Sequence, residues 1–146
     1  MTVIRTATPA DEAAWRRLWA DYLRFYAVDL APEVTSLTWS RILDPASRLN
    51  ARLADVDGTV QGFAVWHRHV ASWSAKDDCY LEDLFVADSV RGLGLGRALL
   101  DDLITVARDA GCGRFYWHTD EDNSRARALY DSYALADGHV RYRFAL

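Results

Sequence analysis

The sequence is short of the residues that build disulfide frameworks, metal sites and membrane spans. It contains two cysteines, Cys79 and Cys112, and four histidines that show no metal-ligand spacing with them. We therefore expect no metal site, and we expect both cysteines to pack near the core as small apolar residues. No apolar run approaches the roughly 18 residues that a membrane span needs, so we expect no membrane partner.

The charge and the composition of the chain limit its expected partners and its domain organisation. Asp and Glu number 21 against 17 Lys and Arg, and the formal net charge is −4. This balance argues against a nucleic-acid partner and mildly favours cationic ones. The first residues lack the charged-then-apolar layout of a signal peptide, so we expect a cytoplasmic protein. With 51% hydrophobic and 12% aromatic residues in 146, the chain suits one domain, residues 1–146, around one core.

The hydrophobic pattern predicts a sheet interleaved with helices. Alternating or apolar segments predict strands over residues 3–5, 49–56, 60–70, 80–86, 114–119 and, after an Asp137-Gly138 turn, 139–146. Apolar stripes at helical spacing predict helices over residues 8–26, from 35 or 36 to 43, over 95–110 and over 123–133. This order predicts an α/β (α+β) fold with helices on both faces of the sheet.

The stretch from Tyr80 to Leu103 points to a ligand. An apolar strand ends at Val86, and Arg91-Gly92-Leu93-Gly94-Leu95-Gly96-Arg97 then opens a helix. Alternate glycines leave main-chain amides open at the positive end of a helix dipole, and the two arginines add charge. We infer a site for a phosphate, most simply a pyrophosphate. The alternative is that the glycines only tighten a turn between strand and helix.

Two common phosphate-binding loops do not match this stretch. A P-loop needs Gly-Lys-Ser/Thr after its glycines, whereas the chain has Arg97-Ala98. A dinucleotide-binding turn needs its third glycine where Arg97 stands, and it follows the first strand of its fold, whereas earlier strands are predicted here. Both nucleotide readings therefore fail on spacing.

The loop instead resembles the Arg/Gln-x-x-Gly-x-Gly/Ala signature of the GCN5-related N-acetyltransferase (GNAT) superfamily. The preceding Tyr-Leu-Glu-Asp-Leu-Phe-Val is similar to the central strand of its polyamine and diamine acetyltransferase branch. The resemblance implies a single GNAT-like domain with a mixed, mostly antiparallel sheet, acetyl-CoA as acyl donor and a homodimer. It implies transfer to the primary amine of a small molecule (a polyamine, diamine or amino-acid-like amine) by direct attack in a ternary complex. Two alternatives stay open: a protein N-terminus or lysine as acceptor, and a non-catalytic acyl-CoA-binding module.

The resemblance also implies roles for individual residues. The glycine loop wraps the pyrophosphate, and the strand bulges and splays near residues 84–86, where its backbone pairs with the pantetheine arm. The Val86 N–H faces the thioester oxygen. The residues implied in cofactor binding are Leu84, Phe85, Val86, Arg91, Gly92, Leu93, Gly94, Leu95, Gly96, Arg97, Asn123, Ser124, Arg125 and Ala126.

Two further residues are implied in catalysis. Tyr130 lies seven residues after Asn123 and serves as general acid toward the leaving thiolate, and Glu82 contacts the acceptor amine. The structural alternatives are a packed core tyrosine and an ion-paired glutamate, and Asp83 is expected to tie the strand to an arginine or a backbone amide. The residues implied in substrate binding are Tyr22, Tyr26, Asp29 and Glu82. Finally, Ala134-Leu135 stands where the family has Gly-Phe, so we expect a short final hairpin.

Overall fold

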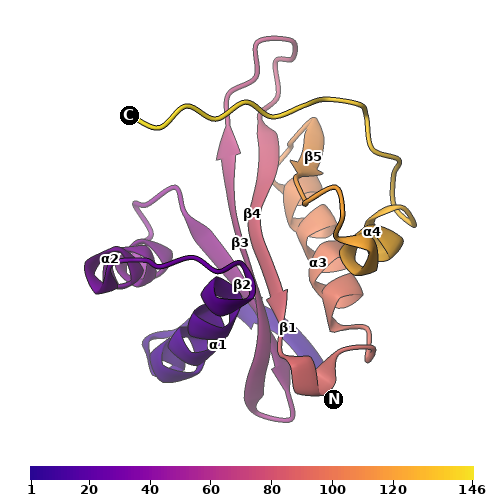
Figure 1. Ribbon diagram of the computed structural model, residues 1–146. Coiled ribbons are helices and arrows are strands. Elements are labelled where there is room, and N and C mark those ends of the chain that lie inside the picture. Colours follow the sequence, from indigo (N-terminus) through magenta and orange to yellow (C-terminus); the bar gives the residue numbers. More distant parts are fainter.

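Five strands form one sheet, and helices cover both of its faces in the computed structural model, which describes residues 1–146 (Figure 1). The strands are β1 (Thr2–Thr6), β2 (Asn50–Val56), β3 (Thr59–His69), β4 (Asp78–Val86) and β5 (Arg114–Trp117). The helices are α1 (Glu12–Phe25), α2 (Pro32–Leu43), α3 (Leu95–Asp109) and α4 (Ser124–Tyr130), with short 3-10 turns η1 (Pro9–Asp11) and η2 (Asp88–Val90).

The sheet is mixed and mostly antiparallel, as expected. Its strand order is β1-β2-β3-β4-β5, with antiparallel pairing up to β4 and parallel pairing between β4 and β5. Helix α3 lies in the crossover that the parallel pair requires. The β2–β3 hairpin turns at Asp57-Gly58, where both residues have positive φ.

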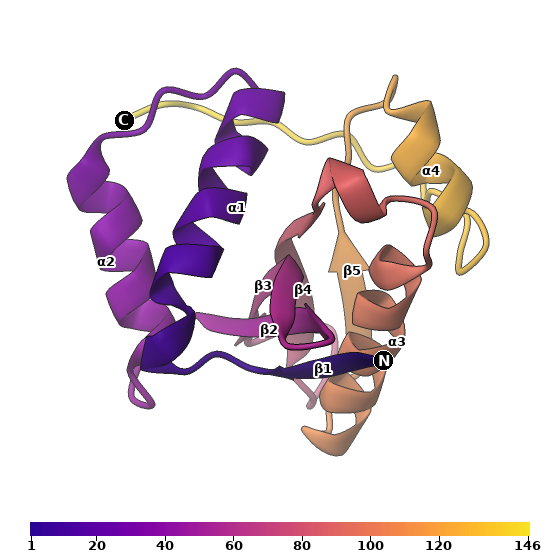
Figure 2. The same ribbon diagram turned by 90° about the horizontal axis from the view of Figure 1, so that it is seen from below.

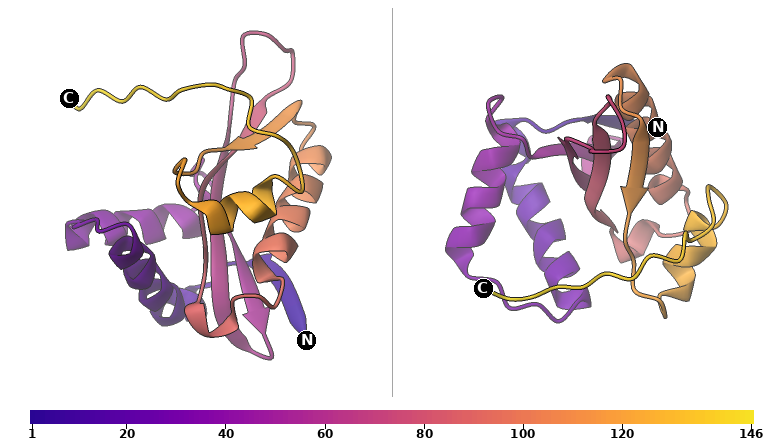
Figure 3. Two further views of the ribbon diagram at one scale, coloured as in Figure 1. Left: turned by 45° about the vertical axis from the view of Figure 1, so that its right-hand side comes forward. Right: turned by 90° about the horizontal axis from the view of Figure 1, so that it is seen from above.

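Helices α1 and α2 lie on one face of the sheet and α3 lies on the other (Figures 2 and 3). Each face has its own apolar core. On one face, Trp15 of α1 stacks on Trp19 and Trp39 with ring centroids 5.1 Å apart in both pairs, above Phe63 of β3. On the other face α3 buries four leucines against β2, β3 and β4, namely Leu95, Leu99, Leu100 and Leu103. The two tryptophans of α1 are therefore core residues. None of the helices is long and apolar enough to cross a bilayer.

Two irregularities of β4 create an opening in the sheet. The register with β3 passes from Trp66–Leu81 to Val65–Asp83, so Glu82 is the extra residue of a β-bulge. Strand β5 pairs with β4 only up to Leu81–Trp117 and then leaves it. The edge of β4 from Glu82 to Val86 therefore has no strand beside it on this side. The expected splay is present, whereas the bulge lies earlier than residues 84–86.

Two expectations about the elements were wrong. Helix α2 begins at Pro32 rather than after Thr35 or Ser36, because proline suits the first helical position, where its missing N–H costs nothing. Residues 139–146 form no strand, and Val140, Tyr142 and Phe144 are 77%, 94% and 87% exposed. Only residues 134–136 lie between the last turn after α4 and the predicted Asp137-Gly138 turn, and this segment is too short to serve as a partner strand. The tail therefore has an alternating pattern without a partner.

Candidate active site

A groove of about 590 Å³ runs between α1, the free edge of β4, the glycine loop and α4. Its wall contains every residue predicted to bind the cofactor except Leu93 and Ser124. Its other lining residues are Tyr22, Phe25, Tyr26, Val90, Leu129 and Tyr130. The structure thus brings together two segments about thirty residues apart in the sequence, the glycine loop and the start of α4.

The glycine loop offers a set of unpaired amides to this groove. The N–H groups of Gly92, Gly94, Leu95, Gly96 and Arg97 have no acceptor within the chain. They surround the N-terminus of α3, a 15-residue helix, where the helix dipole favours negative charge. An anion with several acceptor oxygens, such as a diphosphate, is the ligand that satisfies such a set.

Backbone conformation explains two of the three glycines. Gly92 and Gly94 have φ of +83° and +82°, in the left-handed region that residues with a Cβ rarely adopt. No atom lies within 4 Å of a Cβ built at either position, so the space in front of them is open. Gly96 differs, because its Cβ would lie 3.2 Å from Leu129 of α4. Gly96 therefore allows α4 to pack closely on α3.

Both arginines of the loop are held in place by neighbours. The Arg91 guanidinium pairs with Asp88 at 2.8 Å and lies over the rings of Phe25 and Phe85, 5.7 and 5.8 Å from their centroids. Arg97 donates to the Ser132 hydroxyl at 3.0 Å. Both arginines line the groove at the end where the free amides of the glycine loop lie.

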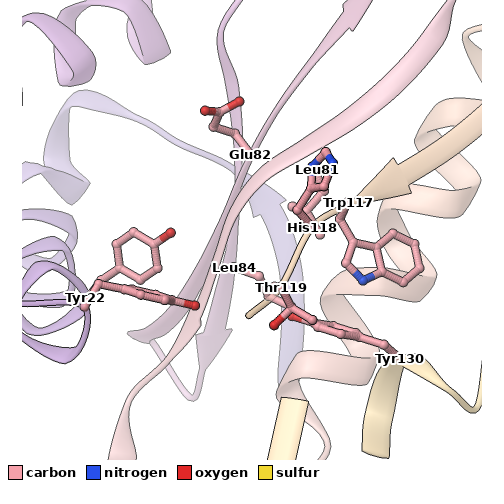
Figure 4. A pocket seen from close by; sticks show the side chains of 9 residues that line it. Tyr22, Leu81, Glu82, Leu84, Trp117, His118, Thr119 and Tyr130 are labelled. Atoms are coloured by element: carbon pink, nitrogen blue, oxygen red, sulfur yellow. The ribbon is translucent and has the colours of Figure 1, made fainter. Parts of the chain in front are cut away.

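A second, much smaller cavity of about 30 Å³ opens beside the groove (Figure 4). It has room for about one water-sized group. It shares four lining residues with the groove: Tyr22, Tyr26, Leu84 and Tyr130. Figure 4 shows Tyr22, Glu82 and Tyr130 approaching this cavity from three sides, from α1, β4 and α4. A group in the small cavity therefore lies next to a group in the groove.

Tyr130 stands at this junction with a free hydroxyl. Its ring packs against Trp117 at 5.4 Å, and its hydroxyl has no hydrogen-bond partner within the chain. Burial, with a smaller effect from Tyr26, raises the pKa of Tyr130 to about 12. The site therefore keeps the phenol protonated. It does not lower the pKa toward that of a thiol, so Tyr130 is better suited to donating a hydrogen bond than to losing its proton.

Glu82 lies at the outer edge of the small cavity. Its side chain is 47% exposed, and its Oε2 lies 3.5 Å from His67 Nε2. Beyond it, a sheet face without a helix on it carries a set of aromatic and imidazole rings in mutual contact: His67, His69, Tyr80, Tyr116 and His118. The bulge at Glu82 turns its carboxylate toward this face and toward solvent.

Asp83 has a different environment from the one expected. It binds neither an arginine nor a backbone amide, and its carboxylate instead accepts a 2.7 Å hydrogen bond from the Tyr22 hydroxyl. Burial raises the pKa of Asp83 to about 6, the Tyr22 hydrogen bond opposes this rise, and the charge of Glu82 adds to it. The pair joins residues 61 positions apart, so no local pattern could have revealed it.

Of the other predicted site residues, some line the cavities and one does not. Tyr22 and Tyr26 line both cavities, whereas Asp29 is exposed and lines neither. The Asn123 side chain accepts from the Ala126 N–H, so it caps α4 while it lines the groove. Sequence reasoning missed seven lining residues, most of which carry no motif of their own: Phe25, Leu81, Val90, Trp117, His118, Thr119 and Leu129.

The comparisons with known proteins agree with this geometry. The Acetyltransferase (GNAT) family model matches residues 12–134. The chain is 36% identical over 143 residues to D-amino-acid N-acetyltransferase HPA3 of Saccharomyces cerevisiae, covering 97% of this chain and 89% of the relative. It is 34% identical to aminoglycoside N(6')-acetyltransferase type 1 of Stenotrophomonas maltophilia, covering 87% and 81%.

A solved structure shares the whole fold. It is AAC(6')-Iy in complex with the bisubstrate analogue CoA-S-monomethyl-acetylneamine, with a TM-score of 0.83 and 20% identity over 100% of this chain and 99% of the other. The chain belongs to the GNAT family of acetyltransferases. It is an acyltransferase whose donor is acetyl-CoA, and the open amides, the free β4 edge and the groove fit that donor.

Proposed function

We propose that this enzyme transfers the acetyl group of acetyl-CoA to the primary amine of a small molecule by direct attack within a ternary complex. The observation that carries the proposal is the junction of the two cavities at Tyr22, Tyr26, Leu84 and Tyr130. A thioester in the groove and an amine in the small cavity would be neighbours there. Neither cysteine lines either cavity, which favours direct attack over a cysteine-bound acyl group.

Different residues around this junction would bind different parts of acetyl-CoA. The free amides of the glycine loop and the arginines would hold the diphosphate, and the unpaired β4 edge at Leu84–Val86 would align the pantetheine arm. A free β4 amide, at Val86 as the resemblance implies, would stabilise the oxyanion. Tyr130 would donate its hydrogen bond to the developing thiolate.

The acceptor side favours a small cationic amine. The small cavity has room for about one ammonium-sized group, and carboxylates, Glu82 and Asp83, lie beside it. The named substrates of the relatives, D-amino acids and aminoglycosides, are small molecules with amino groups. We infer an acceptor from the amino-acid-like, diamine or polyamine classes. A homodimer and a cytoplasmic location stay predictions.

Thiol release from acetyl-CoA tests the proposal directly. The assay compares D- and L-amino acids, diamines, polyamines, an aminoglycoside and a peptide with a free N-terminus, and mass spectrometry detects the acetylated product. We expect release with at least one small amine and none without acceptor. Acetylation of the peptide alone would favour the protein-acceptor alternative. Coenzyme binding in calorimetry without release to any acceptor would indicate a non-catalytic module.

A further inference from the structure

Asp83 differs from the other buried or partly buried aspartates of this chain in its hydrogen-bond partner. Asp11, Asp78 and Asp102 each accept from an arginine, at 2.8, 2.8 and 2.7 Å. Asp83 has no cationic partner, and its single hydrogen bond comes from a neutral phenol. Charge in a partly buried site costs free energy unless an opposite charge or further hydrogen bonds compensate it. The structure thus holds a negative charge for which the chain provides no counter-charge.

The partner of Asp83 leads to the reaction centre. The Tyr22 hydroxyl donates a hydrogen bond to Asp83, and Tyr22 lines both cavities at their junction. Its ring is held by close contacts with Tyr26, Phe63 and Phe85, with centroids 5.1, 5.7 and 5.8 Å apart. The phenolic oxygen therefore has a fixed position. It can still accept one hydrogen bond, and the small cavity is the place from which an ammonium group would supply it.

We propose that Tyr22 and Asp83 form a proton relay that neutralises the acceptor ammonium. An N–H proton of the ammonium passes to the Tyr22 oxygen while the Tyr22 hydroxyl proton passes to Asp83 Oδ1. The N–H bond breaks, an O–H bond forms on the carboxylate, and the amine, the phenol and the carboxylic acid are all neutral. This inference rests on the proposed function.

The neutral amine forms the C–N bond, the C–S bond breaks, and the second proton of the nitrogen ends on the sulfur. Asp83 returns its proton to solvent through Tyr22 once the product leaves. Asp83 acts only through Tyr22, so it is a positioning residue.

The environment of Asp83 suits a proton acceptor better than the environment of Glu82 does. The half-exposed Glu82 carboxylate lies beside His67, whereas Asp83 has its pKa raised to about 6 by burial. A carboxylate with this pKa is charged at neutral pH, yet it accepts a proton more readily than an ordinary aspartate. The titratable groups that interact with Asp83 are Tyr22 of α1, Tyr26 just after it, and Tyr80 and Glu82 of β4. His67 of β3 faces Glu82 instead.

The test measures kcat/KM against pH for wild type, Asp83→Asn, Tyr22→Phe and Glu82→Gln. It uses the best amine from the thiol-release panel and an aminooxy compound, which is already neutral at pH 7. With the amine, we expect wild type to lose activity as the pH falls through about 6, where Asp83 becomes protonated. Asp83→Asn and Tyr22→Phe should lose about 10²- to 10⁴-fold at pH 7. Their acid limb with a midpoint near pH 6 should disappear, and their kcat/KM should instead rise steadily with the free-base fraction of the amine. Glu82→Gln should keep the limb, whatever its rate.

The aminooxy acceptor separates the relay from a structural role. It needs no deprotonation, so the wild-type profile should lack the limb, and both relay variants should lose far less activity. This comparison in wild type alone decides the matter if a variant does not fold, which thermal melting and coenzyme affinity reveal. An amine limb that keeps its midpoint near pH 6 in Asp83→Asn, or equal losses with both acceptors, would overturn the relay while the transferase stands. If wild type acetylates no acceptor, the proposed function fails and the relay fails with it.

Discussion

Gly94→Ala offers a sharp test of the diphosphate site, because the chain contains a matched control. Gly94 and Gly58 have φ of +82° and +84°, and a Cβ meets no atom within 4 Å at either position. Gly58 lies in the β2–β3 turn, outside both cavities. Alanine at either site should therefore cost a similar free energy of unfolding, about 1–2 kcal/mol, for the left-handed conformation.

Only the substitution at Gly94 should weaken coenzyme binding. Its methyl group projects into the groove, where it displaces the diphosphate from one or two free amides. A hydrogen bond to a charged group contributes about 1.5–3 kcal/mol, so the affinity for coenzyme A should fall about 10- to 100-fold. Isothermal calorimetry measures this affinity, and urea unfolding measures the stability of both variants.

Acetyl-pantetheine, which lacks the diphosphate, provides a second control for Gly94→Ala. Turnover of acetyl-pantetheine should be nearly the same in wild type and in Gly94→Ala, because the substituted amide has no anion to bind. Wild-type affinity for coenzyme A in Gly94→Ala would refute the reasoning. An equal loss of affinity in Gly58→Ala would also refute it, because that result would trace the effect to stability.

Two further predictions concern catalysis and stability. Tyr130→Phe should lower kcat about 10²- to 10⁴-fold with unchanged coenzyme affinity. Because the Tyr130 pKa is about 12, wild type should show no alkaline loss from this group below about pH 10. A variant with full kcat would show that Tyr130 does not donate the hydrogen bond that stabilises the leaving thiolate. Asp11→Ala should lower the free energy of unfolding by about 2–3 kcal/mol in urea titrations, because Asp11 accepts from both Arg5 and Thr8. Arg5 holds the pKa of Asp11 below its ordinary 3.8, so this stabilisation is present above about pH 4 and is lost as the pH falls further. If Asp11→Ala lowered the free energy of unfolding equally at pH 7 and pH 2, the prediction would be wrong.

The sequence by itself determined the loop chemistry and most of the elements. Alternate glycines between two arginines predict exposed amides because the reason is local: a left-handed φ and an unpaired helix start need no distant residue. The hydrophobic periods placed five strands and four helices, since each period reports which face of its own segment is buried. The position of Tyr130 on its helix followed from the spacing to Asn123 together with the resemblance.

Tertiary structure alone decided how the site is completed. The bulge at Glu82, the early departure of β5 and the Tyr22–Asp83 hydrogen bond each depend on a neighbour that is remote in the chain. The tail shows the converse, because the alternation of Val140, Tyr142 and Phe144 predicts a strand, and a strand forms only where another strand supplies its hydrogen bonds. A local pattern records the preference of a segment, whereas its partner is a property of the folded chain.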